Sequence, residues 1–185
     1  MSPLSRKTIR ANDIPGLEST DFSTHASATK PIALERAMYW QGGPDNAEVC
    51  HASIGLSSPH LAFYLPDGQT SNGWETWITV QNPNPNSVTI EITYLPEGGG
   101  EPVTFTDELL SLTRSTYSME GVEGSYPGYE GRASTVVRSL DGARPIMVER
   151  SMYNNNRGTG AATTEEGGRG AFDSEACFEG SFGNS

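Results

Sequence analysis

The side chains with the most reactive chemistry in this chain are two cysteines, Cys50 and Cys177, and three histidines, His25, His51 and His60. A thiolate activated by an imidazole is a nucleophile, and both groups bind zinc. Cys50 and His51 are adjacent, however, and neighbouring residues of a strand point to opposite faces. The two cysteines also fit no zinc-ligand spacing. We therefore expect neither a Cys-His catalytic pair nor a metal site.

The cysteines suggest a cross-link instead. Cysteine pairs of secreted proteins are more often oxidised than free. A bridge within the chain, a bridge between neighbouring subunits and two free thiols are three open alternatives, of which the first is favoured. In the chain-entropy model an intrachain bridge would stabilise the fold by about 4–5 kcal/mol. Cys50 and Cys177 are therefore disulfide candidates.

Two Glu-Arg pairs, at positions 35–36 and 149–150, place a carboxylate beside a guanidinium. Because neighbours on a strand face opposite ways, we expect each charge to form its own cross-strand ion pair. The serines lie in no Gly-x-Ser-x-Gly elbow, and the glycines at 98–100 lack the Lys-Ser/Thr of a phosphate loop. The sequence therefore predicts no catalytic residues, no cofactor-binding residues and a protein that is not an enzyme.

Carboxylate and amide oxygens in two glycine-rich regions could hold calcium, which prefers such ligands. No Asp-x-Asp-x-Asp-Gly loop is present, so solvated acidic loops are the simpler interpretation. We expect no cofactor, with calcium as the alternative. The oxygen donors concerned are Asp45, Asn46, Glu48, Glu165, Glu166, Asp173 and Glu175.

The charge and hydropathy of the chain exclude two classes of partner. With 12 basic and 23 acidic residues the net charge is −11, which repels phosphate backbones and anionic membrane surfaces. No apolar run approaches the roughly 20 residues of a membrane span. We expect no nucleic-acid partner and no insertion into a membrane.

Tryptophans mark candidate contact surfaces. Trp77 falls on the strand face opposite Ile78 and Val80, so it either packs against a neighbour or marks an interface. Trp40 ends a second strand-like segment. Aromatic residues on strands more often pack between sheets than bind sugars. Trp40 and Trp77 are therefore interface candidates, and a sugar-binding platform is the alternative.

An internal repeat is the most informative feature of the sequence. Residues 31–39 recur as residues 145–153, with six of nine positions identical: Pro, Ile, Glu, Arg, Met and Tyr. Downstream, residues 50–55 loosely match residues 177–183, and each match begins with cysteine. Such agreement in the same order indicates a duplicated structural unit.

Alternating apolar residues between turn signals predict an all-β protein. Residues 88–94 alternate cleanly, with Val88, Ile90, Ile92 and Tyr94 on one face. The segment 81–87 is rich in Asn and Pro, which favour turns. No stretch has the pattern of an amphipathic helix. The strands expected after the first repeat copy are 61–65, 74–80, 88–94, 103–105, 111–117, 133–139 and 145–153.

These strands suit an Ig-like β-sandwich. We expect one complete repeat at residues 56–160, preceded at 1–55 by the C-terminal half of another repeat with strands at 6–10, 23–29 and 31–40. Residues 161–185 form a Gly-rich acidic tail that leads into the next repeat. Half a sandwich leaves strand edges unpaired, so residues 1–55 either pack on the complete unit or are completed by another chain.

Four segments together resemble an uncharacterised family of tandem extracellular repeats in bacterial surface and secreted proteins. They are Ala62–Gly68, Gly73–Asn84, Thr93–Gly98 and the Glu-Arg-x-Met-Tyr signature that occurs twice. The resemblance covers most of the chain in the family's order, although this chain begins within a repeat and adds a Cys to each copy. It implies a β-sandwich with a structural or adhesive role, outside the cell or on its surface.

The leading hypothesis is a non-catalytic extracellular structural module of a bacterial surface protein or fibre that associates with itself. In its stronger form, strands of a neighbouring subunit complete the half repeat. The alternative is an adhesive or carbohydrate-binding module that recognises a cell-surface glycan, with calcium as an aid. An enzyme is the least favoured interpretation, because no nucleophile, base and orienting group can be assembled from the sequence.

Overall fold

The computed structural model describes residues 2–41, 48–154 and 170–173, and β-strands dominate this part of the chain. The chain divides into two compact units, residues 1–32 and 33–185. The elements are the 3-10 turn η1 (Ala11–Asp13) and the strands β1 (Glu35–Gln41), β2 (Glu48–Ile54), β3 (Ala62–Leu65), β4 (Trp74–Gln81), β5 (Val88–Pro96), β6 (Val103–Leu109), β7 (Arg114–Ser118), β8 (Ala133–Ser139), β9 (Met147–Asn154) and β10 (Gly170–Asp173).

The first unit lacks the two strands expected at 6–10 and 23–29, so that prediction is wrong. Neither segment alternates apolar and polar residues over enough length to bury a face, and Ile9 is exposed. The described regular structure in this unit is η1, closed by the amide of Ile14 donating to the carbonyl of Ala11 at 2.9 Å.

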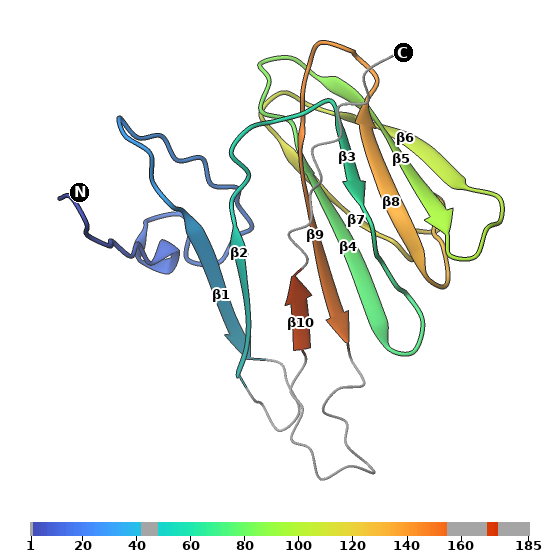
Figure 1. Ribbon diagram of the computed structural model, residues 1–185, viewed down its shortest axis with the longest axis horizontal. Coiled ribbons are helices and arrows are strands. Elements are labelled where there is room, and N and C mark those ends of the chain that lie inside the picture. The colour runs from blue at the N-terminus through green and yellow to red at the C-terminus, as the bar shows by residue number, and fades with distance from the viewer. Residues whose placement is uncertain (1, 42–47, 155–169, 174–185) are drawn as a thin grey trace, which may run out of the picture. The chain divides into compact units, whose positions relative to one another are not determined.

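The second unit contains two four-stranded antiparallel sheets that face each other, as Figure 1 shows. One sheet has the order β10-β9-β4-β7 and the other the order β3-β8-β5-β6. This arrangement confirms the all-β sandwich that the sequence predicted. The strand order differs in several respects from an immunoglobulin constant domain, where the first and fourth strands join the sheet of the second and fifth; in this chain β6 pairs with β5. Here β3 pairs with β8, and β9 takes the place beside β4.

The core lies between the sheets and follows the alternation seen in the sequence. Val88, Ile90, Ile92 and Tyr94 of β5 are at most 1% exposed, as predicted. On β4, Thr76, Ile78 and Val80 face the same interior, whereas Trp74 and Trp77 are half-buried. Each sheet thus buries one apolar face against the other. This burial of apolar surface is the main favourable contribution to the free energy of folding.

Two strand boundaries differ from prediction because of a turn. The strand expected at 111–117 begins instead at Arg114, since Leu112 adopts φ 56° and closes the β6–β7 turn. The amide of Leu112 donates to the carbonyl of Asn84 at 3.1 Å and holds the turn in place. The preceding strand, expected to end at Phe105, continues to Leu109.

The strands β1 and β2 form a separate two-stranded sheet, whereas β9 and β10 pair within a four-stranded sheet. Both pairs are antiparallel, and β1 and β9 carry the repeated Glu-Arg-x-Met-Tyr segment. Strand β2 was not predicted, because apolar residues fall on both of its faces, with Val49 on one and Ile54 on the other. The repeated segment thus forms a strand in both copies, but the residue opposite its tyrosine differs: Cys50 faces Tyr39 and Ala171 faces Tyr153.

Removing apolar volume from the centre of the sandwich should cost most of its stability. Ile92→Ala would leave a cavity between the sheets, and we expect a loss of about 2–5 kcal/mol in the free energy of unfolding. Thr89→Ala, on the exposed face of the same strand, is the control and should change this free energy little. Urea denaturation followed by tryptophan fluorescence measures both. Equal effects would contradict the burial pattern.

Candidate functional site

The linker between β2 and β3 brings together a serine and a histidine. Ser58 Oγ and His60 Nε2 are 2.9 Å apart, a distance suited to a nucleophile and its base. The His60 ring packs edge-on against Phe63, and its backbone is bonded in both directions to Ile146. These contacts fasten the linker to the start of β9. This pair could not be predicted from the sequence, because it depends on the local course of the linker.

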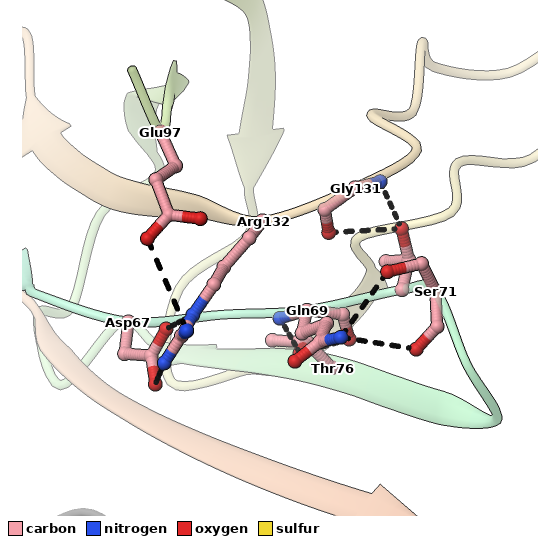
Figure 2. Close-up of polar contacts among 8 residues, drawn as sticks. Asp67, Gln69, Ser71, Thr76, Glu97, Gly131 and Arg132 are labelled. Atoms are coloured by element: carbon pink, nitrogen blue, oxygen red, sulfur yellow. Dashed lines mark hydrogen bonds and ion pairs between the residues drawn. The ribbon is translucent and has the colours of Figure 1, made fainter.

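Polar side chains connect the loops at one end of the sandwich, where β3, β5 and β9 end (Figure 2). Arg132 Nε donates to Asp67 Oδ1 at 2.9 Å and Arg132 Nη2 to Asp67 Oδ2 at 3.1 Å, which is a bidentate pair. Glu97 Oε1 lies 3.9 Å from the same guanidinium. Three separate loops are thereby held around one arginine.

The Asp67 carboxylate is held ionised. Its hydrogen bond from Arg132 lowers the pKa below its ordinary value, partial burial opposes this, and the charges of Arg132 and Arg150 lower it further. The neighbouring carboxylates in turn raise the pKa of Arg132, chiefly through the bond to Asp67. A carboxylate with both oxygens bonded to arginine is poorly suited to accept a proton from a substrate. The arrangement therefore holds loops rather than supplying a general base.

At the opposite end of the sandwich a single amide performs the same task. The side chain of Asn82 is fully buried, and its Nδ2 donates to the carbonyls of Asn86, Leu109 and Leu110 at 2.8, 3.2 and 2.9 Å. Its Oδ1 accepts from the backbone amide of Asn84 at 2.9 Å. The sequence identified this Asn-Pro-rich segment as a turn but did not show that it fixes the β6–β7 turn as well.

One backbone amide on each of the strands β6 and β7 is bonded to a side chain. Asp107 Oδ1 accepts the amide of Glu108 at 2.8 Å, and Asp107 Oδ2 accepts the hydroxyl of Tyr117 at 2.7 Å. On β7, the amide of Ser118 donates to the hydroxyl of Tyr126 at 3.0 Å. Burial, assisted by Asp107, raises the pKa of Tyr117, so its hydroxyl stays protonated and keeps donating.

The β1–β2 hairpin contacts β9 through one carboxylate. Arg36 Nη2 lies 2.6 Å from Glu149 Oε1, and Ser53 Oγ donates to the same oxygen at 2.9 Å. Arg36 belongs to the first copy of the repeat and Glu149 to the second. The two Glu-Arg segments were expected to form cross-strand ion pairs, and the Arg36–Glu149 pair is one that joins the two copies.

The two copies differ sharply in burial. Val148 and Met152 of β9 are 1% and 6% exposed, because they face the interior of the sandwich. The equivalent residues of the first copy, Leu34 and Met38, are each 42% exposed. Chemically matched side chains thus lie inside the core in one copy and at the surface in the other.

The residues predicted as sites are only partly described. Trp77 is half-buried, and its Nε1 donates to Glu75 Oε2 at 3.4 Å. The backbones of Trp40 and Cys50 lie in β1 and β2, but their side chains fall outside the described part of the structure. Cys177 also lies outside it, so the disulfide stays a prediction. The calcium candidates are either outside the described residues or described by backbone alone.

The described residues lack two further features. They contain no group of three or more His, Cys, Asp or Glu side chains arranged to hold a metal ion. Within the same residues no helix has the length and apolar character to cross a membrane.

The sequence matches no protein-family model and no curated protein. Among solved structures, the Anabaena sensory rhodopsin transducer aligns with a TM-score of 0.42 and 18% identity, covering 52% of this chain and 84% of that one. The Thermotoga maritima protein 1070 aligns with a TM-score of 0.43 and 19% identity, covering 52% and 82%. Neither likeness bears on the activity or partners of this chain.

The Asp67–Arg132 pair predicts a specific pH dependence. A carboxylate whose pKa is lowered by folding stabilises the folded state above its ordinary pKa near 4, and this contribution disappears as the pH falls through the lowered value. Asp67→Asn should therefore be slightly less stable than the wild type at neutral pH and equally stable in strong acid. Urea denaturation across this pH range measures the difference, with Glu101→Gln as a control for an exposed carboxylate. A constant difference at all pH values would be inconsistent with this cause.

Replacing the amide of Asn82 should weaken one end of the sandwich. Asn82→Ala leaves buried carbonyls without donors, and we expect a loss of at least about 2 kcal/mol in the free energy of unfolding. Asn82→Asp keeps the size but presents acceptors to those carbonyls, so it should be no better. Chemical denaturation measures both variants, and Asn86→Ala is the control because Asn86 contributes only a backbone carbonyl to the network. Wild-type stability in Asn82→Asp would refute the role of the donor.

Proposed function

We propose that the protein is a non-catalytic extracellular structural module of a bacterial surface protein or fibre. Copies of the chain associate with one another, and the contact covers the β1–β2 hairpin. The observation that carries this proposal is the burial of Val148 and Met152 against the exposure of Leu34 and Met38. A strand whose apolar residues match those of a core strand gains free energy when another strand or sheet covers them.

Three further observations support a structural role. Polar groups at both ends of the sandwich, around Arg132 and Asn82, are used to hold loops together. The hairpin has a defined attachment to the sandwich through Glu149. In addition, β1 and β2 form a sheet of two strands in the described part of the chain, outside both sheets of the sandwich.

The cysteines belong to the same proposal. Cys50 pairs in register with Tyr39 within the hairpin, close to the segment that would contact another copy. A disulfide from Cys50, either to Cys177 or to a neighbouring subunit, would strengthen an assembly outside the cell, where disulfides persist. Electron microscopy of the purified protein with and without reductant tests whether fibres form and whether they depend on a disulfide.

Self-association should depend on the apolar residues of the hairpin. Leu34→Lys and Met38→Lys place charges at exposed positions, so folding should be preserved while association weakens at least about tenfold, equivalent to 1.4 kcal/mol. Sedimentation over a wide concentration range measures this, and Thr89→Lys on β5 is the control. A wild-type chain that stays monomeric throughout, or hairpin variants that associate normally, would remove the proposal. Glycan binding that is lost in Trp77→Ala would favour the adhesive alternative.

A further inference from the structure

The turn that leads into β4 is built on an asparagine and a glycine with left-handed backbone conformations. Asn72 has φ 56° and Gly73 has φ 79°, and the amide of Trp74 donates to the carbonyl of Ser71 at 3.2 Å. Positive φ at both central residues is the property of a type I′ turn, for which Asn-Gly is a preferred sequence. This is the one Asn-Gly dipeptide of the chain.

The residues on either side hold this turn in place, as Figure 2 shows. Gln69 Nε2 donates to the carbonyl and to the hydroxyl of Ser71 at 3.3 and 3.2 Å. The hydroxyl of Thr76 donates to the carbonyl of Gln69 and accepts the amide of Gln69, both at 2.8 Å. Asn72 is exposed, and within the described part of the chain neither its side chain nor the amide of Gly73 has a hydrogen-bond partner.

An exposed Asn-Gly step can react with itself. The backbone nitrogen of the glycine loses its proton and attacks the side-chain carbonyl carbon of the asparagine, and the side-chain amide leaves as ammonia. Water then opens the resulting succinimide ring at either carbonyl, which yields aspartate or isoaspartate. The net reaction consumes one water and releases one ammonia. Glycine reacts most readily because it has no Cβ to hinder the approach of its nitrogen.

Two Asp-Gly steps, at positions 67–68 and 141–142, could form the same ring with loss of water, but ion pairs restrain both. Asp67 accepts two hydrogen bonds from Arg132, which hold its pKa below the ordinary value. An ionised carboxylate resists attack because it carries no good leaving group. Asp141 is paired with Arg144. The folded chain therefore leaves Asn72 as the most reactive of the three positions.

We infer that Asn72 is the site of a spontaneous modification of the folded protein, in which attack by the Gly73 nitrogen converts the asparagine to aspartate and isoaspartate. In the isoaspartate product the main chain runs through the former side chain, so the turn is longer by one carbon. The bonds from Trp74 to Ser71 and from Thr76 to Gln69 must then close around an altered backbone. The start of β4 should loosen as a consequence.

Peptide mapping of the folded chain after incubation at mildly alkaline pH tests the inference. After unfolding, a glutamate-specific protease releases residues 49–75, in which Asn72 is the single asparagine. This peptide should show the small mass gain of an amide NH₂ replaced by OH and should separate into two isomers. One isomer should be a substrate for an isoaspartate-specific methyltransferase. Conversion should accelerate as the pH rises, because the attacking nitrogen must lose its proton.

Asn86 is a control within the same chain, since it is also exposed but precedes Ser87. The Cβ of Ser87 hinders the attacking nitrogen, so Asn86 should convert at least about tenfold more slowly, equivalent to about 1.4 kcal/mol in activation free energy. Asn72→Gln requires a larger ring, and its peptide should stay unmodified over the same time. Equal conversion at Asn72 and Asn86, or a wild-type 49–75 peptide that stays unmodified, would overturn the inference.

The unfolded chain shows whether the folded structure selects the site. In guanidinium chloride the ion pairs of Asp67 and Asp141 are lost, so isoaspartate should form at these positions as well as at Asn72. In the folded chain it should form at Asn72 well before either aspartate. Conversion of Asn72 in the unfolded chain alone would show that the turn protects it, and the inference would be wrong.

Hydrogen exchange measures the consequence for β4. Ion exchange separates the modified chains, which carry one more negative charge than the unmodified ones. The amides of Gln69 and Trp74 should exchange faster in the isoaspartate form than in the wild type. Asn72→Asp is the matched control, because it adds the same charge without lengthening the main chain, and it should exchange as the wild type does. Unchanged exchange in the isoaspartate form would contradict the expected loosening.

Discussion

Burial of alternate side chains between two facing sheets is the constraint on which the rest of the structure depends. Ile90 and Ile92 of β5 share one buried core with Ile78 and Val80 of β4, and exposing either inner face to water would be unfavourable. Because the side-chain period of a strand is two, this burial also fixes the register of every strand. The first copy of the repeated segment has the same alternation of apolar and polar residues, but no equivalent core surrounds it. Its apolar residues Leu34 and Met38 are therefore exposed.

The polar groups of the sandwich have a role that follows from this packing. Once the inner faces of the sheets are packed together, the chain must reverse direction at both ends of the sandwich. It must do so without leaving buried backbone N–H and C=O groups unbonded. Asn82 satisfies carbonyls from two loops at one end, and Arg132 joins Asp67 and Glu97 at the other. Asp107 and Tyr126 complete the pattern along one side, where they bond strand amides that would otherwise pair with another chain. These polar and charged side chains therefore bond to other parts of the same chain.

Sequence reasoning succeeded where alternation was strong and failed where tertiary contacts decide. The inward face of β5 could be predicted in full, because four large apolar residues alternate with polar ones. The turn at Leu112 could not, because a leucine with positive φ is disfavoured locally and is held there by the carbonyl of Asn84. The pairing of Arg36 with Glu149 joins residues far apart in the chain, so the spacing of the two segments indicated ion pairs but not their partners.

The hydrogen bonds of Asn82 also indicate where the chain would tolerate inserted sequence. Because one amide fixes the β4–β5 and β6–β7 connections together, lengthening either would disturb both, and foreign sequences inserted there would be poorly tolerated. The β5–β6 turn is different, since Gly98 and Gly99 have no neighbouring atoms within 4 Å of where a side chain would begin. That turn is therefore the natural place to graft an epitope or a tag.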